Sequence, residues 1–126
     1  MIIKKFEVHN NNIPCVYIAI GKECYLIPSD RIRLKIGLSR HMGSRRRTLR
    51  CDSRYLVETI YECPLPNANN RLEQIEHSLH IWLHNAPTAI GGGGEEDTGD
   101  YHIAEMLIEQ FPIMARAIAE QYTGRG

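Results

Sequence analysis

The stretch Ile13-Pro14-Cys15-Val16-Tyr17-Ile18-Ala19-Ile20 predicts the central element of the fold. It is apolar and contains β-branched residues, which indicates a strand buried on both faces. A second strand is expected over Arg31 to Leu38, where basic and apolar residues alternate. One face carries Arg31, Arg33 and Lys35, and the other carries Ile32, Leu34, Ile36 and Leu38. This alternation is typical of a half-buried strand with a basic exposed face.

Periodicity and turn residues assign the rest of the chain. The other expected elements are a leading strand over Ile2 to Val8, a helix over Arg40 to Arg50, a strand over Tyr55 to Cys63, a helix over Pro66 to Asn85, and a final helix over Ala104 to Tyr122 interrupted near Phe111-Pro112. Turns are expected at Gly21-Lys22 and Pro28-Ser29-Asp30, and a flexible loop at Gly91 to Gly94. The helix over Pro66 to Asn85 has the clearest apolar stripe, formed by Leu72, Ile75, Leu79, Trp82 and Leu83.

Length and composition restrict the class of protein. The 126 residues are expected to form one domain, 1–126, which is too small to hold a catalytic domain together with a full recognition domain. No apolar run approaches the roughly 20 residues of a membrane span, and the first residues do not resemble a signal peptide. A cytoplasmic protein is therefore expected. Its four cysteines have no C-x-x-C spacing and are interpreted as single, mostly buried thiols, with a zinc or disulfide role as the alternative.

The charge is unevenly distributed, although 15 basic and 15 acidic residues balance over the whole chain. Between Arg31 and Arg54 the only acidic residue is Asp52, whereas every charged residue between Gly91 and Phe111 is acidic. A basic block rich in arginine, which binds phosphate in bidentate fashion, favours a nucleic-acid partner. The alternative is a solvated helix face that pairs with the acidic segment.

Helical spacing separates the arginines after the second strand. Leu38, Met42, Arg45 and Leu49 fall at i, i+4, i+7 and i+11, so Arg45 is expected on the inward stripe. Arg46, Arg47 and Arg50 are expected to point outward. An inward arginine must be paired or must face a cleft. The alternative to a functional role is a structural salt bridge between Arg45 and Glu58, Glu62 or Glu73.

Glu76 occupies a distinctive position on the helix over Pro66 to Asn85. It lies about 40° round the helix from Leu72, at the edge of the apolar stripe. A half-sheltered carboxylate there suits a metal ligand. His80 and His84 continue the same row, but the spacing lacks an H-E-x-x-H order and an obvious third ligand for zinc.

Several motifs, taken in order, resemble those of the GIY-YIG nuclease superfamily, in particular its branch in phage and mobile-element proteins. Val16-Tyr17-Ile18 is similar to the first motif, and Lys35-Ile36-Gly37 to the second, which often reads Lys-Ile-Gly in this branch. Arg45 follows Gly37 by eight residues, as the family's helix arginine does. The two remaining matches are Glu76-x-x-Leu79-His80 and the closing segment Gly99-Asp100-Tyr101-His102-Ile103.

The resemblance covers about residues 13–103 and implies an α+β fold, with a small central antiparallel sheet of about three strands flanked by helices. The implied activity is metal-dependent hydrolysis of phosphodiester bonds, most naturally in DNA. Glu76 would hold one Mg²⁺ or Mn²⁺, Arg45 would stabilise the transition state, and Tyr17 would orient or deprotonate the attacking water. Lys35 would bind phosphate or assist proton transfer. The arginines assigned to nucleic-acid binding are Arg33, Arg40, Arg46, Arg47 and Arg50, and His80 and Tyr101 are assigned supporting positions around the site.

The chain also departs from the family pattern. Cys15 replaces the first glycine, and Lys35 replaces the tyrosine of the second motif. The connection from Tyr17 to Lys35 is longer than is usual in the family, and it contains Tyr25. If the motifs form one site, Tyr17, Lys35, Arg45 and Glu76 should converge on one cleft.

Two alternatives to an active nuclease are left open. One is a nucleic-acid-binding module that kept the fold and the basic face but lost turnover, with Tyr17 as an ordinary buried strand tyrosine. The other is a phage-type inhibitor or accessory protein that acts through protein contacts, for which the acidic segment would be the contact surface.

Overall fold

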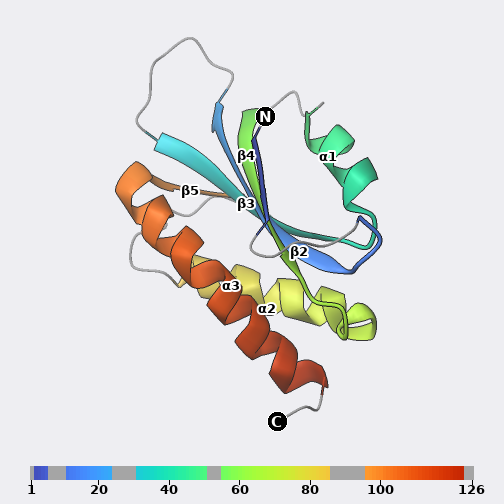
Figure 1. The fold of residues 1–126 in the computed structure, drawn as a ribbon. Helices are drawn as coiled ribbons and strands as arrows, with labels where there is room; N and C mark the ends of the chain where they lie inside the picture. Colours follow the sequence, from blue (N-terminus) through green and yellow to red (C-terminus); the bar gives the residue numbers. More distant parts are fainter. Residues whose placement is uncertain (1, 6–10, 24–30, 51–54, 86–95, 124–126) are drawn as a thin grey trace.

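The computed structural model of the chain describes residues 2–5, 11–23, 31–50, 55–85 and 96–123. Its strands form one five-stranded sheet in the order β1-β4-β2-β3-β5 (Figure 1). The elements are β1 (Ile2–Lys5), β2 (Cys15–Glu23), β3 (Arg31–Ser39), α1 (Met42–Arg50), β4 (Tyr55–Pro64), the 3₁₀ turn η1 (Asn69–Arg71), α2 (Leu72–His84), β5 (Glu96–Asp100) and α3 (Tyr101–Thr123). The fold is therefore α+β, as expected.

The three central strands β4, β2 and β3 are antiparallel, which confirms the predicted centre of the sheet. Two shorter strands extend it at the edges. β1 pairs with β4 in parallel, and β5 pairs with β3 in antiparallel orientation. The leading strand was expected, whereas the strand formed by the acidic segment was not.

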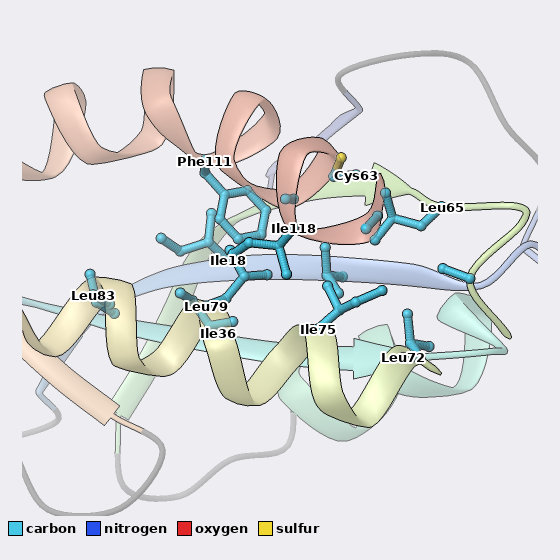
Figure 2. Close-up of a cluster of buried hydrophobic side chains, with 14 of the residues drawn as sticks. Ile18, Ile36, Cys63, Leu65, Leu72, Ile75, Leu79, Leu83, Phe111 and Ile118 are labelled. Atoms are coloured by element: carbon cyan, nitrogen blue, oxygen red, sulfur yellow. The ribbon is translucent and has the colours of Figure 1, made fainter. Parts of the chain in front are cut away.

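Alternation along β2 divides the interior into two cores. Val16 and Ile18 point to one face, where they pack with β3 side chains beneath α2 and α3 (Figure 2). Tyr17 and Ala19 point to the other face, where Met42 of α1 packs against them. Both faces of β2 are thus removed from water, which is why its sequence is a continuous apolar run rather than an alternating one.

The first helix begins two residues later than its periodicity indicates. The backbone N–H of His41 donates to the Ser39 hydroxyl at 2.9 Å, and the N–H of Met42 donates to the Asn11 carbonyl at 3.0 Å. These bonds form the turn after β3, so Arg40 lies outside α1. The second helix begins at Leu72, after the 3₁₀ turn η1.

Two expected breaks are wrong. The chain does not turn at Gly21-Lys22, because β2 continues to Glu23 and absorbs a register shift between Ile20 and Gly21. Helix α3 continues through Pro112. Proline removes one helical hydrogen bond, but Leu107, Phe111 and Ala115 are buried on both sides of it and hold the helix in the core. The turn at Pro28-Ser29-Asp30, the loop at Gly91 to Gly94, and Tyr25 lie outside the described residues.

The basic strand and the acidic segment are neighbours in the sheet. The antiparallel register sets Arg31 opposite Asp100 and Lys35 opposite Glu96. The acidic segment therefore adjoins a basic strand rather than a helix face. None of the helices in the described ranges is both long and apolar enough to cross a membrane.

Candidate active site

Tyr17 and Gly37, one from each of the two motif strands, face each other across the β2–β3 pair. A side chain at Gly37 would overlap the hydroxyl and the adjoining ring carbons of Tyr17. The phenol ring therefore lies over Gly37 of β3, because only glycine lacks the side chain that would collide with it. Tyr17 is buried, with 1% of its surface exposed. The pairing gives a physical reason for a tyrosine in one motif and a glycine in the other.

Gly37→Ala is expected to destabilise the protein by about 1–3 kcal/mol, because overpacking a filled interior costs about that much. Chemical denaturation measures this loss. Gly43→Ala in α1 is the matched control, since its new methyl group would only reach van der Waals contact with Asn11, and alanine favours a helix over glycine. If the loss is the same in a Tyr17→Ala background, the phenol is not the cause.

The edge of β3 beside Gly37 has no partner strand in the described part of the chain. β5 pairs with β3 only from Arg31 to Lys35, which leaves Ile36–Ser39 bonded to β2 alone. Lys35 is half-buried on the same face as Tyr17, because it is the register partner of Ala19. The phenol thus extends from the central strand towards the part of β3 that β5, over its described residues, does not cover.

Arg46, not Arg45, is the arginine of α1 that pairs with a buried carboxylate. Its Nε and Nη2 atoms donate to the two carboxylate oxygens of Glu62 at 2.6 and 2.5 Å, and its Nη1 donates to the Asn11 side chain at 2.9 Å. Glu62 is fully buried and is the β4 register partner of Tyr17. The expectation that Arg46 points outward is therefore wrong, and its bidentate pair ties α1 to β4.

The error has a simple geometric cause. Met42 and Leu49 are the buried residues of α1, and Arg45 and Arg46 each lie about 50° from the centre of that stripe, on opposite sides. Counting Leu38 as part of the helix shifted the expected stripe towards Arg45. Leu38 in fact belongs to β3 and packs on the opposite face of the sheet.

Arg45 is left half-buried on the flank of α1 that points away from Glu62. Its side chain makes no hydrogen bond or ion pair with the residues that the structure describes. It is thus a sheltered cation with its donors available, whereas the neighbouring Arg47 is exposed. The side chains of Arg33, Arg50 and Tyr101 lie outside the described set.

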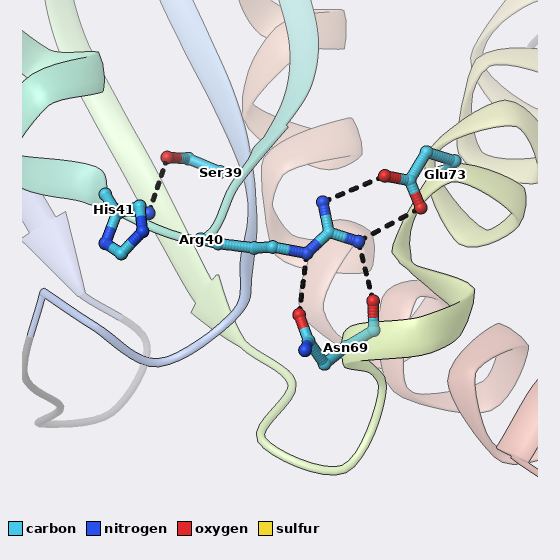
Figure 3. A network of polar contacts seen from close by, with 5 residues as sticks. All are labelled: Ser39, Arg40, His41, Asn69 and Glu73. Carbon is cyan, nitrogen blue, oxygen red and sulfur yellow. Dashed lines mark hydrogen bonds and ion pairs between the residues drawn. The ribbon is translucent and has the colours of Figure 1, made fainter.

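Arg40, also assigned to nucleic-acid binding, is held by side chains of the protein itself (Figure 3). It donates to both carboxylate oxygens of Glu73 and to the side chain and carbonyl of Asn69. These four bonds use all three guanidinium nitrogens. Its charge therefore joins the end of β3 to the start of α2.

Glu76 comes from the opposite side of the sheet. Its helix, α2, packs on the face that carries Val16 and Ile18, whereas Tyr17 lies on the face covered by α1. The predicted convergence of Tyr17, Lys35, Arg45 and Glu76 on one cleft is therefore not found, because these residues do not share one face of the sheet. Among the four, Tyr17 and Lys35 lie on one face and Glu76 on the helix beneath the other.

The flank of α2 that carries Glu76 is the one that contacts the end of β3, and not the one that contacts α3. Ser78 marks the opposite flank, because its hydroxyl lies 3.0 Å from the Tyr122 hydroxyl of α3. Glu76 is about 160° round the helix from Ser78, so it points away from α3. Glu73, on the flank of Glu76, contacts Arg40 at the end of β3.

Glu76 also lies at the level of Gly37 along β3. In Figure 2, α2 runs along β3, with Leu79 close to Ile36. In the first turn of α2, Glu73 contacts Arg40, which directly follows β3. Glu76 lies between Glu73 and Leu79 in the helix and is therefore beside the Ile36–Arg40 segment, which contains Gly37. The phenol and the carboxylate approach this segment from opposite faces.

Glu76 has one close ionisable neighbour, His80, whose Nε2 lies 3.3 Å from a carboxylate oxygen. Both side chains are largely sheltered, with 19% and 13% of their surfaces exposed. No group of three or more ligand-type side chains occurs in the described ranges. A single carboxylate fits Mg²⁺ or Mn²⁺ rather than zinc, because Mg²⁺ retains several waters and takes its other ligands from phosphate.

No family model matches this chain, and comparisons with curated proteins and with solved structures give no match. The candidate site consequently rests on the geometry of its residues.

Two further features lie away from this site. A pocket of about 410 Å³ opens between the connection after β4 and the last turns of α3, and none of the predicted site residues lines it.

Cys15, which stands where the compared motif has its first glycine, is a buried thiol beside Tyr17. Burial, and then the nearby charge of Glu62, raises its thiol pKa, so it stays protonated and acts as a small apolar side chain. Cys63 is buried as well, whereas Cys24 and Cys51 lie outside the described residues.

Proposed function

We propose that this chain is a GIY-YIG-type, metal-dependent endonuclease that hydrolyses phosphodiester bonds in DNA, with its site beside the Ile36–Ser39 part of β3. One observation carries the proposal. The phenol of Tyr17 crosses Gly37 towards the same short segment of β3 that the Glu76 flank of α2 faces. The tyrosine and the sheltered carboxylate thus lie on opposite faces of the sheet, beside the same short stretch of β3.

Each residue has a separate role in the proposed reaction. Glu76 would hold a Mg²⁺ or Mn²⁺ ion, which supplies Lewis-acid stabilisation of the phosphoryl oxygens. Arg45, whose donors are available, offsets the negative charge that develops in the transition state. Lys35 binds a neighbouring phosphate, and the buried Tyr17 hydroxyl orients a water molecule by hydrogen bonding.

The nucleic acid would lie across α1 and the edge of β3. Arg45 and Arg47 remain as cations of α1 that no described carboxylate pairs with, whereas Arg40 and Arg46 are committed to Glu73 and Glu62. Phosphate binding on α1 thus falls mainly on Arg45 and Arg47. The proposed compartment is the cytoplasm, which suits the single buried thiols.

Incubation of the protein with plasmid, branched DNA and RNA in Mg²⁺ or Mn²⁺ tests this function. Cleavage that EDTA abolishes is the expected result. Arg45→Gln is expected to lower the cleavage rate by about 10²–10³-fold, the usual effect of removing one transition-state donor. Arg47→Gln removes the same charge from an exposed position two residues further along α1. It should mainly weaken DNA binding and flatten the salt dependence of that binding by up to about 0.9 in log–log slope. Equal effects of the two variants would contradict the assignment of Arg45.

A second function, nucleic-acid binding without turnover, is favoured by one specific observation. Only 1% of the Tyr17 surface is exposed, and the second phenol of the family pattern is replaced by Lys35. A wild-type protein that binds DNA with a steep salt dependence, but cleaves no substrate in either metal, would establish this binding module instead of the nuclease.

A further inference from the structure

Arg40 makes four hydrogen bonds that join two separate elements (Figure 3). Its Nη1 and Nη2 atoms donate to the two carboxylate oxygens of Glu73 at 2.8 and 3.1 Å. Its Nε and Nη2 atoms donate to the side-chain and backbone oxygens of Asn69, both at 2.6 Å. Arg40 directly follows β3, and Asn69 and Glu73 flank the start of α2.

The start of α2 packs into the core through the fully buried Leu72, but it has no side-chain cap. Neither Ala68, before η1, nor Arg71, before α2, provides a capping side-chain hydrogen bond within the described structure. Helix starts without a cap fray more easily, because their first N–H groups have no partners. The four bonds from Arg40 therefore tether the first turn of α2 to the end of β3.

This tether acts one turn away from Glu76. Glu73 and Glu76 are separated by three residues, which brings them to the same flank of α2. Movement of the first turn relative to β3 would shift the Glu76 carboxylate relative to Gly37 and the phenol of Tyr17. The hydrogen bonds with Arg40 lower the pKa of the Glu73 carboxyl, so the tether is complete at neutral pH and is lost only as the pH falls into the acid range.

We infer that Arg40 is a positioning residue for the metal site: it fixes the first turn of α2 against the end of β3, so that Glu76, one turn further along α2, is held in place relative to β3. The inference rests on the proposed nuclease function. It also removes Arg40 from the nucleic-acid contacts assigned from sequence, because its donors are already used.

Arg40→Gln tests this role, because it keeps a polar side chain but removes the charge and the bidentate geometry. The Mg²⁺ concentration for half-maximal cleavage is expected to rise about tenfold, as is usual when a residue behind a metal ligand is changed. The affinity for DNA in the absence of metal should stay within about twofold of the wild type. Mn²⁺ titrated into the DNA-free protein should broaden NMR signals of Glu76 and His80 at higher concentrations in Arg40→Gln than in the wild type.

Arg71→Gln is the matched control, because Arg71 is an exposed arginine next to the same helix start and takes no part in the network. It should leave both metal titrations unchanged. Exchanging the charges in Arg40→Glu with Glu73→Arg should recover part of the metal affinity that Arg40→Gln loses.

The remaining outcomes are distinct. Unchanged metal titrations in Arg40→Gln, with a cleaving wild type, would overturn the positioning role and leave the nuclease function intact. A loss of DNA affinity without a metal effect would make Arg40 a phosphate contact and would equally overturn it. A wild type that never cleaves would refute the proposed function, and this inference with it.

Discussion

Glu76→Gln is expected to reduce cleavage in Mg²⁺ by several orders of magnitude while DNA binding persists or tightens. The amide keeps the shape of the side chain but removes the charge that would hold the metal, and the described ranges contain no group of three or more ligand-type side chains that could hold it instead. Binding improves where one negative charge leaves a site for a polyanion. Stability should fall by no more than about 1 kcal/mol, because the lost contact with His80 is a single partly exposed pair.

The matched control is Glu109→Gln, which removes the same charge from an exposed position on α3. It should cleave like the wild type. Substrate cleavage and DNA binding are measured in parallel on each variant, and unfolding is followed by denaturation. A Glu76→Gln protein with wild-type cleavage would show that the metal site has been misassigned.

Arg46→Met is expected to cost about 3–5 kcal/mol of stability, the largest single effect on the fold. Methionine fills much of the same volume but leaves the fully buried Glu62 carboxylate without its bidentate partner. The cost is large because an uncompensated charge is left in a medium of low polarity. The free energy of unfolding in urea measures it directly.

Two comparisons isolate the cause. Arg47→Met changes an exposed arginine at the next position of α1 and should stay within about 0.5 kcal/mol of the wild type. The double variant Arg46→Met with Glu62→Leu should recover most of the stability, since replacing a whole buried ion pair by apolar groups is often neutral. A double variant as unstable as Arg46→Met alone would place the cost in lost packing rather than in the orphaned charge.

Much of the fold follows from local patterns in the sequence. The alternation of Leu34, Lys35 and Ile36 predicted a half-buried strand, and the structure buries the two apolar residues while leaving Lys35 partly exposed. The stripe from Leu72 to Leu83 predicted the buried face of α2. Such patterns are readable because the repeat of a strand or helix is a property of the segment itself.

The partners of the arginines are not readable in this way. Arg46 reaches Glu62 across 16 residues of sequence, and Arg40 reaches Glu73 across 33. Arg45 and Arg46 flank the buried stripe of α1 almost symmetrically, so periodicity gives no preference between them. Which of the two arginines is paired depends on where β4 lies relative to α1 in the folded protein, because β4 carries Glu62.

The sequence alone determined which residues line each element and which charges cluster, because hydrophobic burial imposes a short-range repeat. Only the tertiary structure decided that β5 joins the basic strand, that α3 continues through Pro112, and that the helix of Glu76 lies on the face opposite Tyr17. These features depend on how strands and helices far apart in the chain pack against each other. Long-range contacts of that kind offset the free-energy cost of a proline in a helix or of a weak edge strand. Local sequence propensities do not include these contacts and therefore cannot predict their effect.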